Sequence, residues 1–392
     1  MRSRTIVVFG ILGRSPYAGV AWQGLHYLEG LRRLGHDVWY VEDTGDWPFD
    51  LEQNSVTEDP GYTLRFLERT LAWAGFADRW AYRAASRDGH VYGPAAPKLA
   101  SLLARADALL NVTGATLLRD EHRHVPVRAY LETDPVLAEL EVAQGKRSTI
   151  DALASHTHHF TFGENLGSAE CWVPVEPFHY RPTRQPVVID WWSSQATPAA
   201  GGANPLRLTT VTTWRQTAKD IQWQGQTLRW SKHEQFLKFI DLPRRSGHVC
   251  ELALTEADAD TMTLLTENGW RLRDAIPLTM DILPYRDYLR GSGAEFTVAK
   301  EQYVAPRTGW FSDRSASYLA AGRPVITQDT GFGRVLPTGR GLFAFRTVED
   351  ILGAIDAIAS DYHTHARAAR EIAVEHFAAE IVLARLLAEA GL

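Results

Sequence analysis

The chain has 392 residues, of which 45% are hydrophobic and 22% charged, and its formal net charge is −6. This length predicts two domains, and the acidic balance argues against nucleic acid as the main partner. Two cysteines, Cys171 and Cys250, exclude a disulfide framework, and no Cys/His cluster has zinc spacing, so we expect a cytoplasmic protein. No apolar run approaches the roughly 20 residues that a membrane span needs.

The N-terminal stretch predicts the opening unit of a doubly wound sheet. Thr5–Phe9 is an apolar run rich in β-branched residues. Together with the basic residues before it, this run resembles a signal peptide, but the small-residue cleavage site is missing. An amphipathic helix is expected at about 21–34 and a second strand at 37–41, which completes a right-handed βαβ unit. The glycines of this unit do not fit the dinucleotide-binding pattern G-x-G-x-x-G. The acidic Glu42 and Asp43 at the end of the second strand keep NAD binding as a weak alternative. The loop residues expected to line a cleft are Gly13, Tyr17 and Gly19.

Polar residues follow the next predicted strands at the points where those strands end. Strands are expected at 108–112, 128–131 and 158–162. Their polar followers lie at the carboxyl edge of an open α/β sheet, where ligands bind. These followers include Asn111, Glu132, Asp134, Glu164 and Asn165.

The strand–helix rhythm lapses between about 172 and 205, where prolines recur and a low-complexity run follows. We therefore predict an N-terminal Rossmann-like domain at 1–180, a linker with an exposed loop at 181–205, and a second Rossmann-like domain at 206–365. Residues 366–392 are predicted to form a helix that crosses back to the first domain. The fold class is thus α/β, with two doubly wound domains that face each other across a cleft.

Two short motifs in the second half are interpreted as helix starts. Ser231-Lys-His-Glu234 has the pattern of a capping box that opens a helix at 232–240. Asp258-Ala-Asp260 matches the D-x-D metal motif, but it lies where a first helical turn is expected, and there the acids favour the helix dipole. We therefore predict no metal site.

The stretch Tyr303–Gly341 predicts an anion site. A loop leads into a short helix with an N-cap at Ser312, and a buried strand then ends in a glycine-rich loop with Asp329. A helix N-terminus beside the carboxyl end of a strand is a place to hold a phosphate. Arg307 is nearby, and Arg314 in the first turn opposes the helix dipole unless it meets an anion. The stretch thus indicates a nucleotide-diphosphate ligand, with Asp329 accepting hydrogen bonds from sugar hydroxyls.

The same residues resemble the donor-binding half of nucleotide-sugar glycosyltransferases of the GT-B fold. The resemblance lies in Ser317–Ile326, Asp329-Thr-Gly331 and Gly341-Leu-Phe, and in Leu34–Val38 of the opening unit. It implies a sugar donor in the C-terminal domain, an acceptor against the N-terminal domain, and no cofactor. Trp270 and Arg271 stand where these enzymes keep a base-stacking aromatic. The implied donor-binding positions are Thr213, Trp214, Trp270, Arg271, Arg307, Gly309, Ser312, Asp313, Arg314, Ser315, Asp329, Thr330 and Gly331.

The chain departs from that family at its best-known acids. Many retaining members carry two glutamates eight residues apart, where this chain has Gly309 and Ser317, and it has no histidine in the first loop. The candidate general bases are therefore Asp134 and Glu132, which follow one strand. The other candidates are His156, His158, His159 and Glu164. Three alternatives on the same fold stay open: a catalytically inert nucleotide-sugar-binding subunit, an epimerase and a phosphorylase. A fourth, a two-lobed solute-binding protein, would need a signal peptide.

Overall fold

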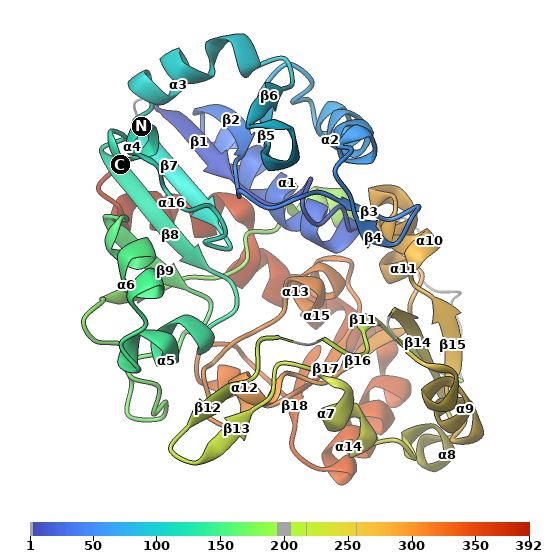
Figure 1. Ribbon diagram of the computed structural model, residues 1–392. Coiled ribbons are helices and arrows are strands. Elements are labelled where there is room, and N and C mark those ends of the chain that lie inside the picture. Colours follow the sequence, from blue (N-terminus) through green and yellow to red (C-terminus); the bar gives the residue numbers. More distant parts are fainter. Residues whose placement is uncertain (1–2, 194–204, 217, 256) are drawn as a thin grey trace.

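The computed structural model describes residues 3–193, 205–216, 218–255 and 257–392, and it has two α/β halves (Figure 1). The N-terminal half is built on an eight-stranded sheet and the C-terminal half on a six-stranded sheet. Helices lie on both faces of each sheet, as expected when strands bury apolar side chains on both sides. The structure confirms the predicted α/β class with two doubly wound units.

The N-terminal sheet is parallel except at one edge. Its strands are β1 (Thr5–Phe9), β2 (Asp37–Glu42), β5 (Trp80–Ala84), β6 (His90–Tyr92), β7 (Ala108–Val112), β8 (Val127–Glu132), β9 (His158–Thr161) and β10 (Tyr180–Pro182). Their order is β10-β9-β8-β7-β1-β2-β5-β6, and β6 runs antiparallel to β5. The other elements of this half are α1 (Ala18–Arg33), the hairpin β3 (Phe49–Asp50) and β4 (Ser55–Val56), α2 (Gly61–Trp73), α3 (Leu99–Arg105), α4 (Asp120–Arg123), α5 (Leu137–Ala143) and α6 (Arg147–Ala154).

All neighbouring strands of the C-terminal sheet pair in parallel. They are β11 (Arg207–Thr213), β14 (Val249–Thr255), β15 (Arg271–Asp274), β16 (Ala294–Thr297), β17 (Val325–Gln328) and β18 (Leu342–Phe345). The order β15-β14-β11-β16-β17-β18 is that of a Rossmann sheet, with ligand binding expected where the order reverses. The helices of this half are α7 (His233–Leu237), α8 (Leu242–Ser246), α9 (Ala259–Glu267), α10 (Ile276–Thr279), α11 (Ile282–Arg290), α12 (Glu301–Val304), α13 (Asp313–Ala320) and α14 (Val348–Ser360).

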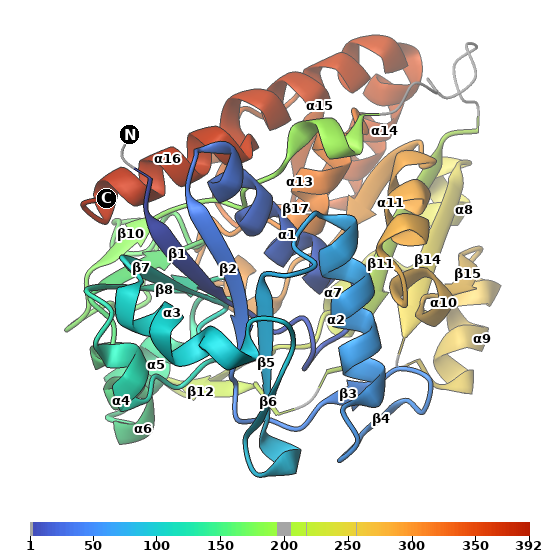
Figure 2. The same ribbon diagram turned by 90° about the horizontal axis from the view of Figure 1, so that it is seen from above.

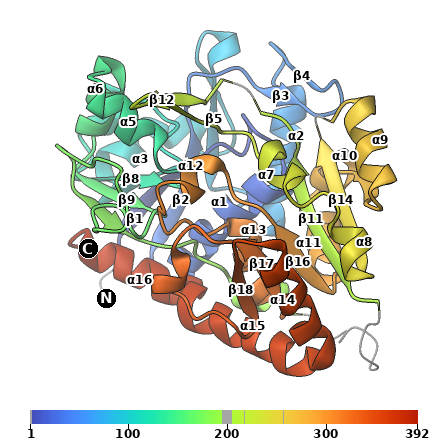
Figure 3. The ribbon, with the colours of Figure 1, turned by 90° about the horizontal axis from the view of Figure 1, so that it is seen from below.

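The last two helices run from the C-terminal half to the N-terminal half. Figure 2 shows α15 (Tyr362–Phe377) and α16 (Ala379–Glu389) along one side of both sheets. Between them the backbone pairs with Val187, whose amide donates to Phe377 O at 2.7 Å. Helix α16 packs on α1, and the two chain ends lie near each other on this half (Figure 3).

The linker contributes aromatic packing at the junction of the halves. Trp191 and Trp192, in the short 3-10 helix Ile189–Trp192, pack against the ring of Trp22, and the Trp22 indole donates to Ile282 O at 3.0 Å. The low-complexity loop predicted within 197–205 lies outside the described residues except for Pro205.

A hairpin of the C-terminal half crosses to the N-terminal half on the opposite side from α16 (Figure 3). Its strands are β12 (Ile221–Trp223) and β13 (Gln226–Leu228). Ile221 and Leu228 share an apolar cluster with Val136 and Leu140. The halves are thus joined on two sides. Among the described helices, none combines the length and apolar character that crossing a membrane requires.

Candidate functional site

The carboxyl ends of the two sheets meet at a set of loops. The side-chain amide of Asn165, beyond β9, donates to Arg307 O at 3.0 Å and to Gly331 O at 3.1 Å. The indole of Trp310 donates across the same interface to Thr133 O, beyond β8, at 2.8 Å. Sequence reasoning noted Asn165 as a polar strand-end residue but did not identify this bridging role.

Gly309 and Gly331 permit this close approach. Their φ angles are +76° and +91°, in the left-handed region that favours glycine. A Cβ atom on either would lie within 2.9 Å of Asn165 atoms. Gly309 therefore has a structural reason to lack a side chain.

The first turn of α13 is open to an acceptor. Ser312 occupies the N-cap position as predicted, but its side chain accepts no capping hydrogen bond. Among the described residues, none accepts from the Arg314 or Ser315 amide, and the buried Ser315 hydroxyl also has no partner. First-turn amides have no intrahelical acceptor, so they point at whatever lies before the helix.

Lys232 faces this region without a counter-ion. Its ammonium nitrogen lies 5.7 Å from the centroid of the Trp310 ring and has no hydrogen-bond or ion-pair partner in the ranges that the structure describes. Burial lowers the pKa of Lys232 well below its usual value, and the nearby Arg314 and Lys300 charges lower it further. A cation without a paired anion is costly in this position.

The sequence reasoning missed Lys232 because it assigned Ser231 to a capping box. In the structure the Ser231 hydroxyl donates to Trp214 O at 3.2 Å and accepts from the Gln216 amide at 3.1 Å, and α7 begins at His233 without a side-chain cap. The capping prediction was wrong because these long-range partners occupy the hydroxyl. They hold the backbone just before Lys232.

The Arg314 guanidinium, which was predicted to meet an anion, has its hydrogen-bond partners within the protein. Its Nε donates to Glu295 Oε1 at 2.6 Å, and its terminal nitrogens donate to Val211 O at 2.9 Å and Thr297 Oγ1 at 2.7 Å. Glu295 is fully buried. The guanidinium therefore neutralises a core carboxylate and anchors α13 to β11 and β16.

Asp329 braces the loop that follows β17. Its carboxylate accepts from the Gly331 amide at 2.7 Å and pairs with Arg307 at 3.2 Å and Arg346 at 2.7 Å. Burial alone would raise the pKa of Asp329, but the Gly331 amide and these two guanidinium groups hold it below its usual value. Thr330 donates to Trp310 O at 2.6 Å. In this arrangement the side chains of Asp329 and Thr330 are already paired within the protein.

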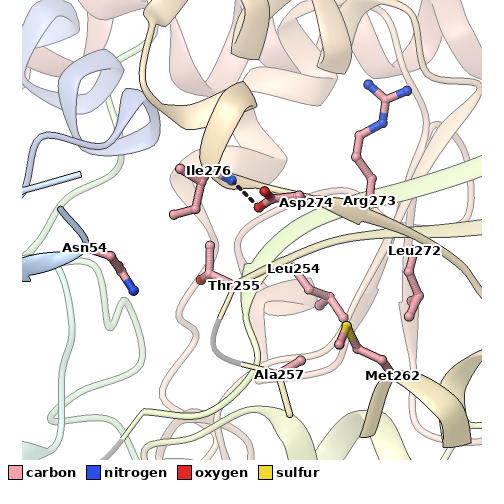
Figure 4. Close-up of a pocket in the computed structure, with 9 residues that line it drawn as sticks. All are labelled: Asn54, Leu254, Thr255, Ala257, Met262, Leu272, Arg273, Asp274 and Ile276. Carbon is pink, nitrogen blue, oxygen red and sulfur yellow. Dashed lines mark hydrogen bonds between the residues drawn. The ribbon is translucent and has the colours of Figure 1, made fainter. Parts of the chain in front are cut away.

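A pocket of ≈ 400 Å³ lies at the carboxyl ends of β14 and β15 (Figure 4). Its walls are mostly apolar. Its polar edge carries Asp274, which accepts from the Ile276 amide at 2.9 Å. The lining residues are Asn54, Leu254, Thr255, Ala257, Met262, Leu272, Arg273, Asp274 and Ile276.

Trp270 and Arg271, the expected base-stacking positions, lie at the other end of β15. Trp270 is buried, its indole donates to Ile240 O at 2.8 Å, and its ring packs against Phe296. The base-stacking expectation does not fit, because the start of a parallel strand lies at the edge opposite its ligand-facing end. Trp214 is likewise buried, and Thr213 ends β11 beside Thr255.

The two candidate bases occupy different environments. Asp134 keeps 42% of its side chain exposed, and it accepts from Lys300 Nζ at 2.8 Å and from the Tyr303 hydroxyl. Crowding by protein atoms would raise the pKa of Asp134, but Lys300 and Tyr303 lower it below its usual value. Glu132 is buried and accepts from Thr161 Oγ1 at 2.7 Å. Glu132 thus lies beneath the surface.

The first loop is held by a buried carboxylate. Glu42 accepts from the Gly13 amide at 2.7 Å and from the Arg14 amide at 2.6 Å. Burial raises the pKa of Glu42 to about 7 although these bonds lower it. Tyr17 stacks on Phe49, and Gly19 lies in the first turn of α1.

The other predicted bases have structural partners. Burial lowers the pKa of His156 to about 4, and His159 Nε2 contacts Leu153 O at 2.9 Å. His158 lies at the start of β9 beside Thr157. Glu164 pairs with Arg184 at 2.6 Å.

One group of side chains in the described residues has metal-ligand spacing. Ligand atoms of Asp43, Glu121 and His122 lie within 4.8 Å of one another. Arg83 and Arg119 already pair with both carboxylates, which neutralises the cluster. Asp258, from the D-x-D match, caps α9 by accepting from the Thr261 amide at 2.7 Å.

Comparison with known proteins establishes the fold. No family model matches the chain, and no curated protein matches it. Among solved structures, an alpha-glucosyltransferase in complex with UDP-glucose and DNA containing an abasic site has 13% identity and a TM-score of 0.61, with 100% of both chains covered. Anabaena Alr3699/HepE in complex with UDP and glucose has 11% identity and a TM-score of 0.57 over 98% of this chain and 100% of that one. AviGT4, a glycosyltransferase involved in avilamycin A biosynthesis, has 12% identity and a TM-score of 0.54 over 99% and 97%. The chain therefore has the GT-B fold, as its sequence resemblance predicted.

Proposed function

We propose that this protein is a cytoplasmic glycosyltransferase that uses a nucleotide-diphosphate sugar. The observation that carries the proposal is Lys232, a half-buried ammonium without a counter-ion beside the open first turn of α13. A diphosphate supplies the missing negative charge and accepts from both donors. Structural neighbours in complex with UDP or UDP-glucose support the same class of ligand.

The pocket at the ends of β14 and β15 is proposed to hold the nucleobase. It lies at the carboxyl edge of the donor-domain sheet, on the β14–β15 side of the point between β11 and β16 where the strand order reverses. Its apolar walls suit a flat ring, while Thr255 and Asp274 offer hydrogen-bond partners at the rim. The diphosphate then extends toward Lys232, and the sugar faces the loop that carries Asp134.

Asp134 is the proposed general base for the acceptor hydroxyl. In transfer, the bond from the sugar C1 to the phosphate oxygen breaks, a bond from C1 to the acceptor oxygen forms, and Asp134 takes the hydroxyl proton. Lys300, whose pKa burial lowers to about 8, holds Asp134 ionised before the donor binds. A diphosphate that competes for Lys300 would weaken this pairing and raise the pKa of Asp134 toward the reaction pH. Lys232 and the helix amides would stabilise the leaving diphosphate.

The proposal is tested by titrating UDP, GDP, ADP and dTDP separately into the full chain. We expect one of them to bind and to raise the melting temperature. Lys232→Met should weaken that binding about 100-fold, because a desolvated charged contact is lost. Lys238→Met is the matched control, since Lys238 lies at the end of the same helix and donates to Gln235 at 3.0 Å. Failure of all four nucleotides to bind would overturn the proposal.

An inert nucleotide-sugar-binding subunit is the second candidate. Two observations favour it: the family glutamates are replaced at Gly309 and Ser317, and Asp134 is already neutralised by Lys300. A donor incubation separates the two candidates. A transferase releases or transfers sugar over time, whereas an inert subunit binds the nucleotide sugar and returns it intact. An epimerase would instead convert the donor into a second nucleotide sugar.

We propose a small-molecule or glycan acceptor. One of the neighbours named above was solved with DNA, but this chain carries a net charge of −6, which opposes binding of a phosphate backbone. Adding duplex DNA should therefore leave donor turnover unchanged. A DNA-dependent rise in sugar release would contradict this choice of acceptor.

A further inference from the structure

The turn that carries Asp134 has an unusual backbone. Val136 has φ of +92°, a conformation that a β-branched residue rarely adopts. Its amide donates to Glu139 Oε2 at 2.7 Å, and Glu139 is 2% exposed in the first turn of α5. Such outliers persist only where the surroundings impose them, and they gather at functional sites.

Glu139 and Glu132 form a buried carboxyl pair. One oxygen of each, Oε1, is buried and accepts from no donor of the described residues, while each Oε2 is occupied by Thr161 or by the Val136 amide. A proton carried by Glu132 and donated to Glu139 would satisfy both oxygens, and the Tyr180 hydroxyl, also buried without a hydrogen-bond partner among the described residues, is a second donor facing Glu139. Burial raises the pKa of Glu132 well above its usual value, and the Glu139 charge raises it further. The other titratable groups that face the pair are Tyr130, Asp134, Cys171 and Tyr180.

The same turn is held from the donor domain. The Trp310 indole donates to Thr133 O at 2.8 Å, and Val136 packs in one cluster with Ile221 and Leu228 of the crossing hairpin. Asp134 is the one residue of the turn whose charged side chain meets Lys300. The turn is therefore fixed below by a carboxyl pair and above by donor-domain residues, with Asp134 presented between them.

We propose that Glu139 is a positioning residue, which through its hydrogen bonds to Glu132 and the Val136 amide holds the 133–136 turn so that Asp134 faces the donor. This inference rests on the proposed function. A capping role alone would need only the Val136 amide. A capping role does not explain why Glu139 also contacts the buried Glu132, or why Val136 has a positive φ.

The test compares Glu139→Gln with Glu139→Leu. Gln keeps both contacts, because its carbonyl accepts from Val136 and its NH₂ donates to Glu132, whereas Leu keeps neither. We expect Leu to lower kcat about 100-fold with the donor KM unchanged, since a misplaced base slows the chemical step. Gln should restore kcat to within a few-fold. Glu141→Gln, on the same helix but bonded to Lys146 and Thr149, is the matched control and should act like wild type.

The pH dependence of kcat is a second measurement, and a purely structural role of Glu139 would not change it. As pH rises, the pair loses its shared proton, two buried carboxylates repel each other, and kcat of wild type should fall. Glu139→Gln removes the second charge, so this alkaline fall should disappear. Equal loss of kcat in the Gln and Leu variants, or an unchanged alkaline fall in Gln, would overturn the inference.

Hydrogen exchange separates this inference from the proposed function. The Val136 amide should exchange slowly in wild type and Glu139→Gln, and rapidly in Glu139→Leu, whether or not the protein turns over a donor. If no nucleotide binds but this exchange pattern is observed, the proposed function is wrong, whereas the conclusion that Glu139 fixes the 133–136 turn is supported. If nucleotides bind and turn over but the Val136 amide is equally protected in all three proteins, the positioning role fails alone.

Discussion

Two cations flank the first turn of α13, and they differ in what surrounds them. Arg314 points into the C-terminal half, where its guanidinium donates three hydrogen bonds, one of them to the buried Glu295. Lys232 lies over the Trp310 ring and has no hydrogen-bond or ion-pair partner among the described residues. A neutralised cation contributes to folding, whereas a cation that the protein leaves unpaired indicates where a ligand binds.

The largest expected effect is on the Arg314 side. Arg314→Met should lower the free energy of unfolding by about 3–5 kcal/mol, because it leaves Glu295 charged and buried without a partner. Chemical denaturation measures this loss. The double variant Arg314→Met/Glu295→Leu should recover much of it. If Arg314→Met instead kept its stability and lost nucleotide affinity, the contrast between the two cations would be reversed.

A second prediction concerns Asp134, the partner of Lys300 across the interface. Asp134→Asn should lower kcat about 100-fold, because the general base is removed. It should also tighten nucleotide binding a few-fold, because Lys300 loses its counter-ion and becomes available to phosphate. Steady-state kinetics and calorimetric titration measure the two effects. Weaker nucleotide binding by Asp134→Asn would contradict this arrangement of charges.

A third prediction uses Asp313, the acid in the same first turn. Burial raises the pKa of Asp313 to about 7, although a hydrogen bond from Gln23 lowers it. Because the folded-state pKa is above the unfolded value, this group costs stability progressively as pH rises from its usual aspartate range to about 7. Asp313→Asn should therefore stabilise the protein by about 1–3 kcal/mol above that pH and by little at acidic pH. Melting curves across pH measure the difference, and a pH-independent change would argue against it.

The smallest expected effect is the uptake of protons when a diphosphate binds. Since the pKa of Lys232 is depressed in the free protein, a bound diphosphate should raise it again and draw up to about one proton from solution. Calorimetry above neutral pH, in two buffers with different ionisation enthalpies, reports this uptake. The uptake should shrink in Lys232→Met. Proton release on binding would contradict the assignment.

The fold could be predicted from local pattern, since the βαβ rhythm and the motif Ser317–Ile326 both depend on neighbouring residues. Asp258 was likewise predicted as a helix-start acid, and it caps α9. Trp270 was misplaced because the pattern identifies a strand but not which of its ends meets the ligand. Arg314 was assigned to an anion, and Lys232 was not considered, for a related reason. Both are cations near one helix, and only the partner Glu295, from another strand, separates them.

The acceptor half shows the same limit. Glu132 and Asp134 are two residues apart, so sequence reasoning treated them as alternatives. At the end of β8 the side chain of Glu132 is buried beside Thr161, because successive side chains of a strand point to opposite faces. The 133–136 turn that follows directs Asp134 outward to Lys300. Glu139 was not considered, because its partner Glu132 becomes visible only once the turn at Val136 is known. Charged pairs between distant segments are what local pattern leaves open.

The most direct test of the account is the free energy of unfolding of wild type and Lys232→Met, each with and without the nucleotide that binds. Without nucleotide, the variant should be more stable by about 1 kcal/mol, because an unpaired desolvated charge is gone. At a nucleotide concentration 100 times the wild-type Kd, wild type should gain about 2.7 kcal/mol and the variant less than about 0.5 kcal/mol, so the order of stability reverses. A variant that is less stable without nucleotide, or that gains as much from it as wild type, would contradict the claim that Lys232 is held unpaired for a diphosphate.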